Sequence, residues 1–385
     1  LDHPEENYPI IHVTGTNGKG SSIAFMSQLF AEHKKKVGTF TSPHMVSIYD
    51  RICVNHKPIS DKDFVRIGRR IQAMERQLLR TQAPLSYFEI LTLIALLYFE
   101  EEQVDVALIE VGIGGLLDAT NVVIGDVAVV TSVELDHQET LGDSIVAIAE
   151  QKAGIFKKKE RAVIGPLAEE ARRVCELRAD ELGVVLYEYG RDFSFSKGQF
   201  SNQDKMIVGL QLGLKGTYQE ENAAVALQSF LLFMKQQNWQ PQVKWIRKAL
   251  QETHWAGRLE YFERGIYLDG AHNLPALSRL VEFIRQQEQK EIFLLFGALK
   301  RKNYQGMLSY LKQELPDVRL TITTFEDDGA IDKRNLTTET YVSSYREFIE
   351  QFIKKSTDNQ LLFVTGSLYF IAEVRAFLLE KELTA

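Results

Sequence analysis

The sequence predicts an α/β protein with two domains in series. Short, continuous apolar runs such as residues 104–109 are typical of parallel strands covered on both faces. These runs alternate with longer segments of helical period, and a second alternating series begins near residue 265. The 385 residues are also enough for two or three domains with buried cores.

The first series occupies residues 1–256 and should form the larger domain, around a parallel-rich sheet. Its strands are expected at residues 10–14, 37–41, 104–111, 126–132, 161–165 and 184–188. Its helices are expected at residues 21–33, 61–80, 86–102, 144–153, 167–182 and 219–236. Residues 190–216 are polar and contain glycine, which indicates an antiparallel excursion.

The second series occupies residues 257–385 and should form a smaller domain. Its strands are expected at residues 266–268, 292–296, 318–322 and 361–364. Its helices are expected at residues 275–289, 303–314, 339–354 and 368–381. Two α/β domains in series should leave a cleft, and clefts between domains are frequent ligand sites.

Composition and charge exclude several classes of protein. Hydrophobic residues make up 45% and charged residues 25%, which is typical of a soluble globular protein. The formal net charge of −7 argues against non-specific binding to nucleic acid. Cys53 and Cys175 are too few for a disulfide framework or a cysteine zinc site. No stretch reads as a transmembrane helix or signal peptide, so we expect no membrane partner. The few cysteines suit a reducing cytosol, and we expect a cytoplasmic monomer with no nucleic-acid partner. The sequence leaves open whether a native N-terminal segment is missing.

Residues 10–22 carry the most informative motif of the chain. An apolar β-branched run ends in a glycine-rich loop, and a helical segment follows. Glycines let backbone N–H groups approach phosphate oxygens, and a helix N-terminus adds a partial positive charge. Lys19 can reach the terminal phosphates of a nucleotide, and Ser21 or Ser22 can face Mg²⁺. The motif therefore indicates a protein that uses a nucleoside triphosphate.

The spacing of this loop differs from that of the usual P-loop. Only two residues separate Gly15 from Gly18, and Gly20 stands between Lys19 and the first serine. A glycine- and serine-rich turn before a helix is also common in proteins that bind no nucleotide. The loop by itself is thus compatible with a phosphate cradle and with an ordinary tight turn.

Polar residues that suit Mg²⁺ follow three of the expected parallel strands. Ligands of open α/β sheets gather at the carboxyl ends of the strands, and Mg²⁺ prefers oxygen ligands. Ser42 and Glu110 fit that preference well, whereas His137 is a less usual ligand. Each also has an ordinary interpretation: Ser42 as a turn residue before Pro43, Glu110 as a surface carboxylate, and His137 as a helix-entry residue.

Three other segments could take part in chemistry, and each has an ordinary alternative. Lys152 lies at an expected helix end, where a lysine often only complements the helix dipole. Residues 268–273 follow a strand, but their Asp and Asn are also common turn and cap residues. Residues 365–368 repeat the arrangement of residues 10–22, in which a strand, a glycine, a hydroxyl residue and a helix follow one another. Either of the last two segments could hold a carboxylate or phosphate oxygen.

Taken together, these motifs closely resemble those of the folylpolyglutamate synthase family. That family includes forms that are also dihydrofolate synthases, and it belongs to the Mur-type ATP-dependent amide ligases. The resemblance covers nearly the whole chain in one collinear order. The matching segments are residues 12–22, 41–44, 51–52, 86–89, 110–121, 135–138, 152–156, 222, 255–260, 268–273 and 365–369. The resemblance implies an N-terminal P-loop ATPase domain and a smaller Rossmann-like C-terminal domain.

The resemblance also implies roles for individual residues. The positions that match the ATP-binding residues are Thr16, Asn17, Gly18, Lys19, Gly20, Ser21, Asn222, Arg258 and Asp269. Those that match the Mg²⁺ ligands are Ser42, Glu110 and His137. Lys152 matches a lysine that is carbamylated by CO₂, and it joins Lys19, Glu110 and His137 as an expected catalytic residue. The positions similar to substrate-binding residues are His272 and Ser367 for glutamate, and Ser86, Tyr87 and Phe88 for a pteroate or folate. The last three could equally be core aromatics that open an apolar helix.

Some positions depart from the family pattern. Arg301 and Asn303 stand where acidic residues are usual, which puts any acidic contact there in doubt. Leu274 replaces a usual proline, and Leu116 replaces a frequent arginine. None of these departures removes an expected phosphate or metal residue, so ATP use is better supported than specificity for the amino acid or the folate.

The function implied by the resemblance is an ATP-dependent ligase that joins L-glutamate to a folate, with dihydropteroate as a further acceptor to be tested. A substrate carboxylate would attack the γ-phosphate, and the glutamate amine would then attack the resulting acyl phosphate. Because the expected ATP and glutamate residues come from both halves of the chain, closure of the C-terminal domain is a hypothesis for excluding water. Loss of ATP-dependent compaction in solution scattering would count against it.

Three other functions are weaker alternatives. A ligase for nucleotide-linked peptidoglycan precursors would normally bring an additional N-terminal domain, and only about nine residues precede the first expected strand. A switch GTPase would need a guanine-reading Asn-Lys-x-Asp, which is not found. A non-catalytic folate-binding protein would not need Lys19, Glu110 and His137. The sequence does not distinguish dihydropteroate from reduced folates, nor does it show the glutamate chain length or the preferred one-carbon form.

Overall fold

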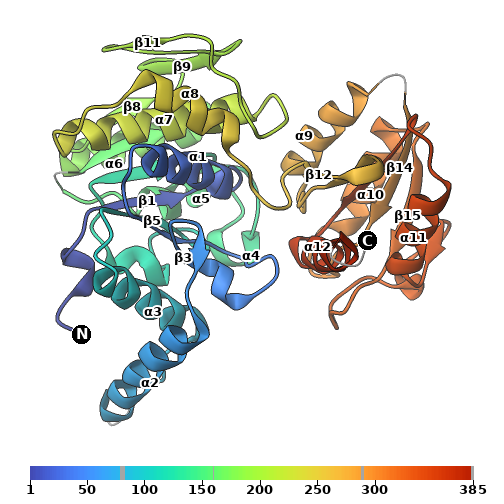
Figure 1. Ribbon diagram of the computed structural model, residues 1–385, viewed down its shortest axis with the longest axis horizontal. Coiled ribbons are helices and arrows are strands. Elements are labelled where there is room, and N and C mark those ends of the chain that lie inside the picture. The colour runs from blue at the N-terminus through green and yellow to red at the C-terminus, as the bar shows by residue number, and fades with distance from the viewer. Residues whose placement is uncertain (79–82, 159, 288–289, 383–385) are drawn as a thin grey trace. The chain divides into compact units, whose positions relative to one another are not determined.

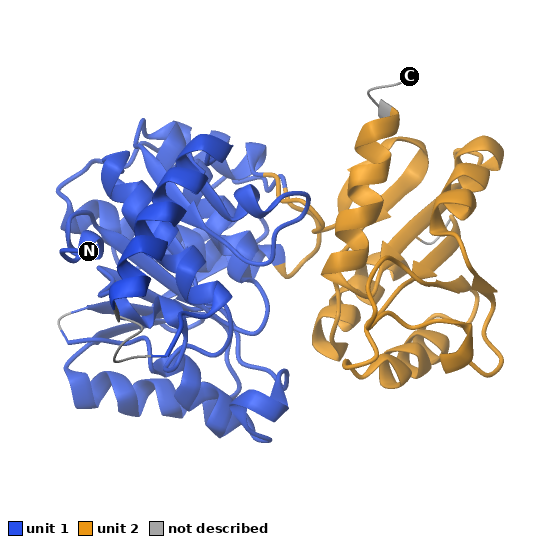
Figure 2. Ribbon diagram, turned by 90° about the horizontal axis from the view of Figure 1, so that it is seen from below, with its two compact units in different colours: residues 1–213, 219–253 blue, residues 214–218, 254–385 orange. Residues whose placement is uncertain are grey.

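The computed structural model describes residues 1–78, 83–158, 160–287 and 290–382. They form two compact units, coloured separately in Figure 2. Unit 1 comprises residues 1–213 and 219–253, and unit 2 comprises residues 214–218 and 254–385. Within the described part of the chain, no helix is long and apolar enough to cross a membrane.

A sheet lies at the centre of unit 1 (Figure 1). It has eight strands in the order β4-β3-β2-β5-β1-β6-β7-β8. Its strands are β1 (Ile10–Thr14), β2 (Val37–Phe40), β3 (Ile52–Val54), β4 (Lys57–Pro58), β5 (Val106–Glu110), β6 (Val127–Val130), β7 (Arg161–Ile164) and β8 (Val185–Glu188). All neighbouring strands are parallel except for the two pairs that involve β3. This confirms the parallel-rich sheet expected from the apolar runs.

Helices cover both faces of this sheet. They are α1 (Lys19–Glu32), α2 (Asp61–Leu78), α3 (Tyr87–Glu101), α4 (Gln138–Leu141), α5 (Ile145–Ala153), α6 (Glu169–Leu182), α7 (Gln219–Gln236) and α8 (Val243–Glu252). Helix α1 packs beside α7 and α8, with Phe30 in edge contact with Phe230 and Phe233 (Figure 1). Buried side chains of α3 pack with those of β2 and β5, whereas those of α5 and α6 pack with β6 and β7. Burial on both faces explains why the central strands are apolar at nearly every position.

A small antiparallel sheet is added to unit 1 within residues 190–216. Its strands are β9 (Phe193–Ser196), β10 (Gln199–Asn202) and β11 (Met206–Ile207), in the order β11-β10-β9. Alternating phenylalanines of β9 and β10 are buried, as expected for a sheet with one covered face. The antiparallel excursion predicted from the polar composition is therefore confirmed.

Unit 2 is a second α/β layer structure. Its six-stranded sheet has the order β12-β13-β17-β14-β15-β16, and only the β12–β13 pair is antiparallel. The strands are β12 (Glu260–Phe262), β13 (Ile266–Leu268), β14 (Glu291–Phe296), β15 (Arg319–Thr323), β16 (Tyr341–Val342) and β17 (Gln360–Thr365). The helices are α9 (Leu274–Arg285), α10 (Tyr304–Glu314), α11 (Tyr345–Lys355) and α12 (Leu368–Glu382).

Short 3-10 helices occur in both units. In unit 1 they lie at Pro4–Glu6, Ile48–Arg51 and Ala119–Val122, and in unit 2 at Glu263–Gly265 and Lys333–Asn335.

Several element boundaries differ from the sequence prediction. The helix expected from residue 339 begins at Tyr345, because the Ser344 side chain accepts a hydrogen bond from the Glu347 N–H and caps it. Residues 341–342 instead form the edge strand β16. Helix α8 was not predicted, although Ile246, Ala249 and Leu250 are buried at helical spacing. Helix α9 ends at Arg285, before the expected residue 289, and the expected positions 79–80 and 288–289 lie outside the described residues.

Candidate active site

The glycine-rich loop connects β1 to α1 at the carboxyl edge of the unit 1 sheet. Gly18 is the residue before α1, and its φ of 87° lies in the left-handed region that favours glycine. A Cβ atom at Gly18 would overlap the Oδ1 atom of Asn222, which belongs to the first turns of α7. The chain therefore enters α1 by a turn that only glycine accommodates, as a phosphate-binding loop requires.

Hydrogen bonds connect the loop to the segment that follows β6. The N–H of Thr16 donates to the Ser132 carbonyl at 2.9 Å, and the N–H of Asn17 donates to the Ser132 hydroxyl at 2.9 Å. The Thr131 hydroxyl donates to the Asn17 carbonyl at 2.6 Å, and the Asn17 side-chain amide donates to the carboxylate of Glu134. Thr131, Ser132 and Glu134 were not predicted as loop supports. Their position directly after a parallel strand is the sequence signal that could have identified them.

Lys19 is the first residue of α1, and its side chain turns back over the loop. Its ammonium nitrogen donates to the carbonyl of Gly15 at 2.8 Å and to that of Thr16 at 3.3 Å. Gly20 and Ser21 follow in the first helical turn, where backbone N–H groups lack partners within the helix. A cation and a helix N-terminus thus lie at one loop, which suits a polyanionic ligand.

Helix α7 supplies buried polar groups beside this loop. Asn222 is 5% exposed, and its amide donates to the Gln219 side-chain oxygen at 2.9 Å. The Gln219 amide in turn donates to the hydroxyl of Ser21 at 3.4 Å. The structure therefore brings Asn222 to Gly18 and Gln219 to Ser21, although about 200 residues separate the two segments in the sequence. Gln219 was not predicted, and its position three residues before Asn222 on one helix face is the signal that was missed.

Replacing Gly18 with alanine is expected to lower the free energy of unfolding by about 1–3 kcal/mol and to weaken ATP binding. The expected cost combines a strained backbone with overlap against Asn222. Urea denaturation and calorimetric titration with ATP measure the two effects. The matched control is Gly183→Ala, because Gly183 also has a positive φ of 67° but has no atom within 4 Å of the added Cβ. Equal losses in both variants would contradict a role for the Asn222 contact.

Two of the three predicted Mg²⁺ ligands meet at the carboxyl edge of the sheet. Glu110 ends β5 and is 4% exposed, and its carboxylate accepts a hydrogen bond from the Ser42 N–H at 3.0 Å. His137 precedes α4 with a φ of 51°, and its Nε2 lies 4.0 Å from the Asp136 carboxylate. Among the described residues, no group of three or more His, Cys, Asp or Glu side chains could by itself hold a metal. A buried carboxylate beside a serine still fits Mg²⁺, because this ion commonly completes its shell with phosphate and water.

Lys152 is buried in the last turn of α5. Lys152 is 3% exposed. This burial lowers the pKa of its ammonium group to about 7. The positive charge of Lys19 lowers this pKa further, whereas the carboxylates of Asp136 and Glu134 oppose the shift. A buried lysine with a pKa this low has a neutral amine available for nucleophilic chemistry near neutral pH.

The segment predicted to contact a pteroate divides into three environments. Ser86 caps α3 in a capping box with Glu89, which accounts for the Ser-x-x-Glu spacing without a ligand. Phe88 stacks on Phe40 with ring centroids 5.6 Å apart and packs against the core. Tyr87 is 58% exposed, and the guanidinium carbon of Arg51 lies 6.0 Å from its ring centroid. Of the two aromatic rings, that of Tyr87 is the more accessible to a ligand.

Of the predicted residues of unit 2, Asp269, His272 and Ser367 follow the neighbouring strands β13 and β17, whereas Arg258 precedes β12. Asp269 is 6% exposed, and its carboxylate accepts from the N–H groups of Leu259 and Ala271, each at 3.0 Å. Burial raises the pKa of this carboxyl group, and the nearby charge of Arg258 opposes that shift. The Nδ1–H of His272 donates to the Gly270 carbonyl at 2.9 Å.

Ser367 is 3% exposed and follows β17 by two residues. The preceding residue, Gly366, donates its N–H to the Ala271 carbonyl at 3.1 Å. This bond brings the segment of His272 beside the segment of Ser367 within unit 2. The two predicted glutamate-site residues therefore belong to adjoining loops.

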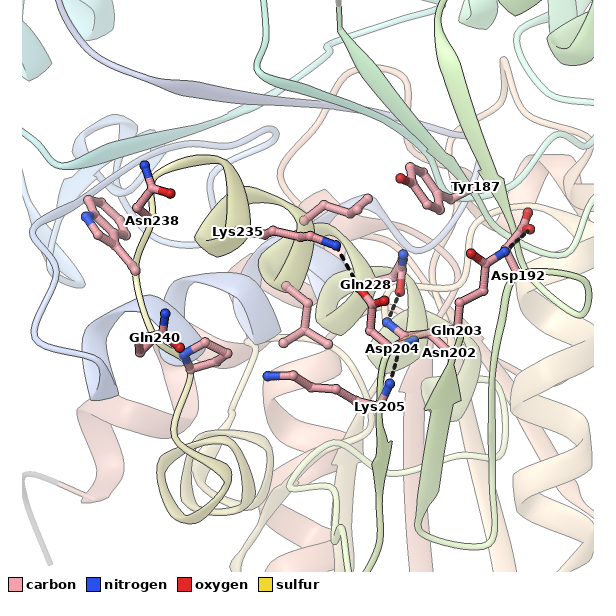
Figure 3. A pocket seen from close by; sticks show the side chains of 14 residues that line it. Tyr187, Asp192, Asn202, Gln203, Asp204, Lys205, Gln228, Lys235, Asn238 and Gln240 are labelled. Carbon is pink, nitrogen blue, oxygen red and sulfur yellow. Dashed lines mark hydrogen bonds and ion pairs between the residues drawn. The ribbon is translucent and has the colours of Figure 1, made fainter.

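A separate pocket of about 380 Å³ lies in unit 1 away from the predicted site residues (Figure 3). It is bordered by the β10–β11 turn, α7 and the segment after α7, and Lys235 pairs with Asp204 at 3.0 Å on its wall. None of its lining residues belongs to the phosphate loop or the predicted metal site. The pocket therefore gives no support for placing the nucleotide there.

Comparisons with known proteins agree with the motif pattern. The Mur ligase middle domain matches residues 13–230, and the Mur ligase glutamate ligase domain matches residues 257–368. The chain is 34% identical to folylpolyglutamate synthase of Lacticaseibacillus casei, over 98% of this chain and 92% of that protein. It is 33% identical to dihydrofolate synthase/folylpolyglutamate synthase of Bacillus subtilis, over 97% of this chain and 91% of that protein.

Solved structures of folylpolyglutamate synthase (FPGS) are also similar to this chain. The apo form of L. casei FPGS has a TM-score of 0.87 at 33% identity, covering 98% of this chain and 93% of that one. An FPGS–AMPPCP–folate complex has a TM-score of 0.87 at 34% identity, covering 98% of this chain and 92% of that one. With both Mur ligase domains in order and one third identity over nearly the full length, the chain belongs to the folylpolyglutamate synthase family of Mur ligases.

Proposed function

We propose that this protein is an ATP-dependent ligase that forms an amide between a folate carboxyl group and the amine of L-glutamate. The observation that carries the proposal is the 34% identity to L. casei folylpolyglutamate synthase over 98% of the chain. A related FPGS structure holds AMPPCP and folate together, which fits a ligase that uses both ATP and a folate. Residues 1–256 would form the ATP-binding domain and residues 257–385 the C-terminal ligase domain. We place the activity in the cytoplasm and assign it to a monomer, with no nucleic-acid or membrane partner.

The proposed reaction has two steps. An oxygen of the folate carboxylate attacks the γ-phosphorus of ATP, the bond to ADP breaks, and an acyl phosphate forms. The neutral amine of glutamate then attacks the acyl carbon, inorganic phosphate leaves, and the amine loses a proton. Phosphorylation is needed because a free carboxylate repels nucleophiles and has a poor leaving group.

Unit 1 would supply the charge stabilisation for the first step. Lys19 and the N–H groups of the first turn of α1 would neutralise charge on the transferring phosphoryl oxygens. Ser42, Glu110 and His137 would hold Mg²⁺, which when bound supplies further charge neutralisation at the phosphates. Lys152 would be carbamylated by CO₂, since its pKa of about 7 leaves a neutral amine to attack the carbon. The reaction would release a proton, and the carbamate would put an anion that can orient the metal in place of the amine.

The remaining assignments concern the substrates. Thr16, Asn17, Gly18, Gly20, Ser21, Asn222, Arg258 and Asp269 would contact ATP. His272 and Ser367 would contact the incoming glutamate, and the proximity of their loops supports a shared site. Tyr87 would provide an aromatic face for the pterin or aminobenzoyl ring, with Ser86 and Phe88 holding its helix.

Incubation with ATP, Mg²⁺ and glutamate tests the proposal when reduced folate and dihydropteroate are offered separately. We expect phosphate release and a product heavier than the added folate by one glutamyl residue. The dihydropteroate reaction tests the second activity, for which the B. subtilis relative is also named. If the protein binds ATP but releases phosphate neither with reduced folate nor with dihydropteroate, the folate assignment is wrong.

A further inference from the structure

The turn that presents Arg258 is backbone-strained and held by two carboxylates. Gly257 has a φ of 67° and Leu259 a φ of 45°, so left-handed residues flank Arg258 on both sides. Leucine rarely adopts this conformation and needs surrounding contacts to hold it there. One such contact is from Asp269, which accepts the Leu259 N–H at 3.0 Å.

The second carboxylate belongs to Glu260. Its Oε2 atom accepts the N–H of Gly257 at 2.8 Å. The Nε of Arg375, on α12, donates to both oxygens of Glu260, at 2.9 and 3.1 Å. The side chains are only 23% and 20% exposed, so solvent screens this pair less than a surface ion pair.

Other contacts connect the turn to the strand end that carries Asp269. The Gly257 carbonyl accepts from the N–H of Gly270 at 2.9 Å and from the Arg258 guanidinium at 3.1 Å. A Cβ atom at Gly270 would come within 2.6 Å of that guanidinium, which shows how closely the Arg258 head lies against the backbone. The direction of the Arg258 side chain therefore depends on the position of Gly257, and Gly257 is held by Glu260.

We propose that Glu260 and Arg375 are positioning residues that fix the Arg258 turn for contact with ATP. The inference rests on the proposed function, in which Arg258 contacts the nucleotide. Arg375 donates hydrogen bonds to the Glu260 carboxylate, and Glu260 accepts one from the Gly257 N–H. The turn fixed in this way orients the Arg258 side chain. Neither Glu260 nor Arg375 needs to touch the substrate for this role.

The test measures KM for ATP and kcat in Arg258→Ala, Arg375→Leu, Glu260→Gln and the Arg258→Ala/Arg375→Leu double variant. We expect Arg375→Leu to raise KM for ATP about tenfold to hundredfold, as for a lost hydrogen bond to a charged group. KM for glutamate and folate should stay unchanged, and Arg375→Lys should recover part of the ATP affinity. The double variant should be no worse than Arg258→Ala alone, because Arg375 acts only through Arg258.

Two further variants separate positioning from general stability. Arg285 pairs with Glu314 at 2.6 Å elsewhere in unit 2, so Arg285→Leu is the matched control and should leave KM for ATP unchanged. Exchanging the pair as Glu260→Arg/Arg375→Glu restores opposite charges but not the acceptor for Gly257, so we expect it to retain the ATP defect. AMPPCP titration of the folded variants provides a binding readout that does not depend on turnover.

The outcomes distinguish the inference from the proposed function. If Arg258→Ala weakens AMPPCP binding but Arg375→Leu behaves like Arg285→Leu, the positioning role is wrong and the function stands. Additive losses in the double variant, or full recovery by the exchanged pair, would likewise overturn the positioning role. If Arg258→Ala leaves AMPPCP binding unchanged, the assigned ATP contact is wrong and the inference is overturned with it.

Discussion

Lys19→Ala is expected to lower kcat by about a hundredfold to a thousandfold while the protein remains folded. The transferring phosphoryl group spreads negative charge over its oxygens, and Lys19 is the cation at the start of α1 that faces the loop. Its ammonium group donates to the carbonyls of Gly15 and Thr16, which belong to the loop itself, and we expect replacement to affect charge stabilisation more than folding. Phosphate release under saturating ATP, glutamate and folate measures the effect.

Lys62→Ala is the control for Lys19→Ala, because Lys62 is exposed near the start of α2. It should retain normal turnover, and both variants should unfold at similar urea concentrations. Near-normal ligase activity in Lys19→Ala would refute the assignment of residues 15–22 as the phosphate loop. Loss of activity in both variants would point to a general charge effect.

Lys152→Arg is expected to abolish most turnover, because arginine keeps a positive charge but cannot form a carbamate near neutral pH. Wild-type activity should fall when CO₂ and bicarbonate are removed, and should return when bicarbonate is added. At a fixed concentration of dissolved CO₂, activity should rise with pH through about 7, because the amine becomes neutral above its pKa. Activity that is independent of bicarbonate would contradict the carbamate.

The depressed pKa of Lys152 also predicts how stability depends on pH. In CO₂-free buffer, the unfolded lysine keeps its proton up to pH 10.5, whereas the folded lysine loses it above about 7. The unfolded state therefore binds more protons between these values, and the free energy of unfolding should rise with pH across this window. Lys152→Met lacks this titration, so the difference between wild type and Lys152→Met isolates the effect. A pH-independent difference would show that Lys152 is not buried as a neutral amine.

The local parts of the site were predictable because each depends on a short stretch of sequence. A β-branched strand, a glycine-rich loop and a helix start follow one another in residues 10–22, and steric limits leave few conformations for such a run. Strand ends also marked Ser42, Glu110 and Asp269 as candidates, since parallel strands present their carboxyl ends at one edge. The helix start at Tyr345 was missed because the Ser344 cap is a weaker signal than the apolar period around it.

Residue type and order predicted the two α/β series, because periodicity and turn residues act over a few neighbouring positions. The collinear motifs, not the periodicity, identified the family. Only the tertiary structure decided that Gln219 reaches Ser21 and Asn222 reaches Gly18. It alone also decided that Arg375 bonds to Glu260 across more than 100 residues. It also decided that Lys152 is buried. Burial and long-range hydrogen bonds depend on which surfaces pack together, and packing is a property of the whole chain that no local pattern encodes.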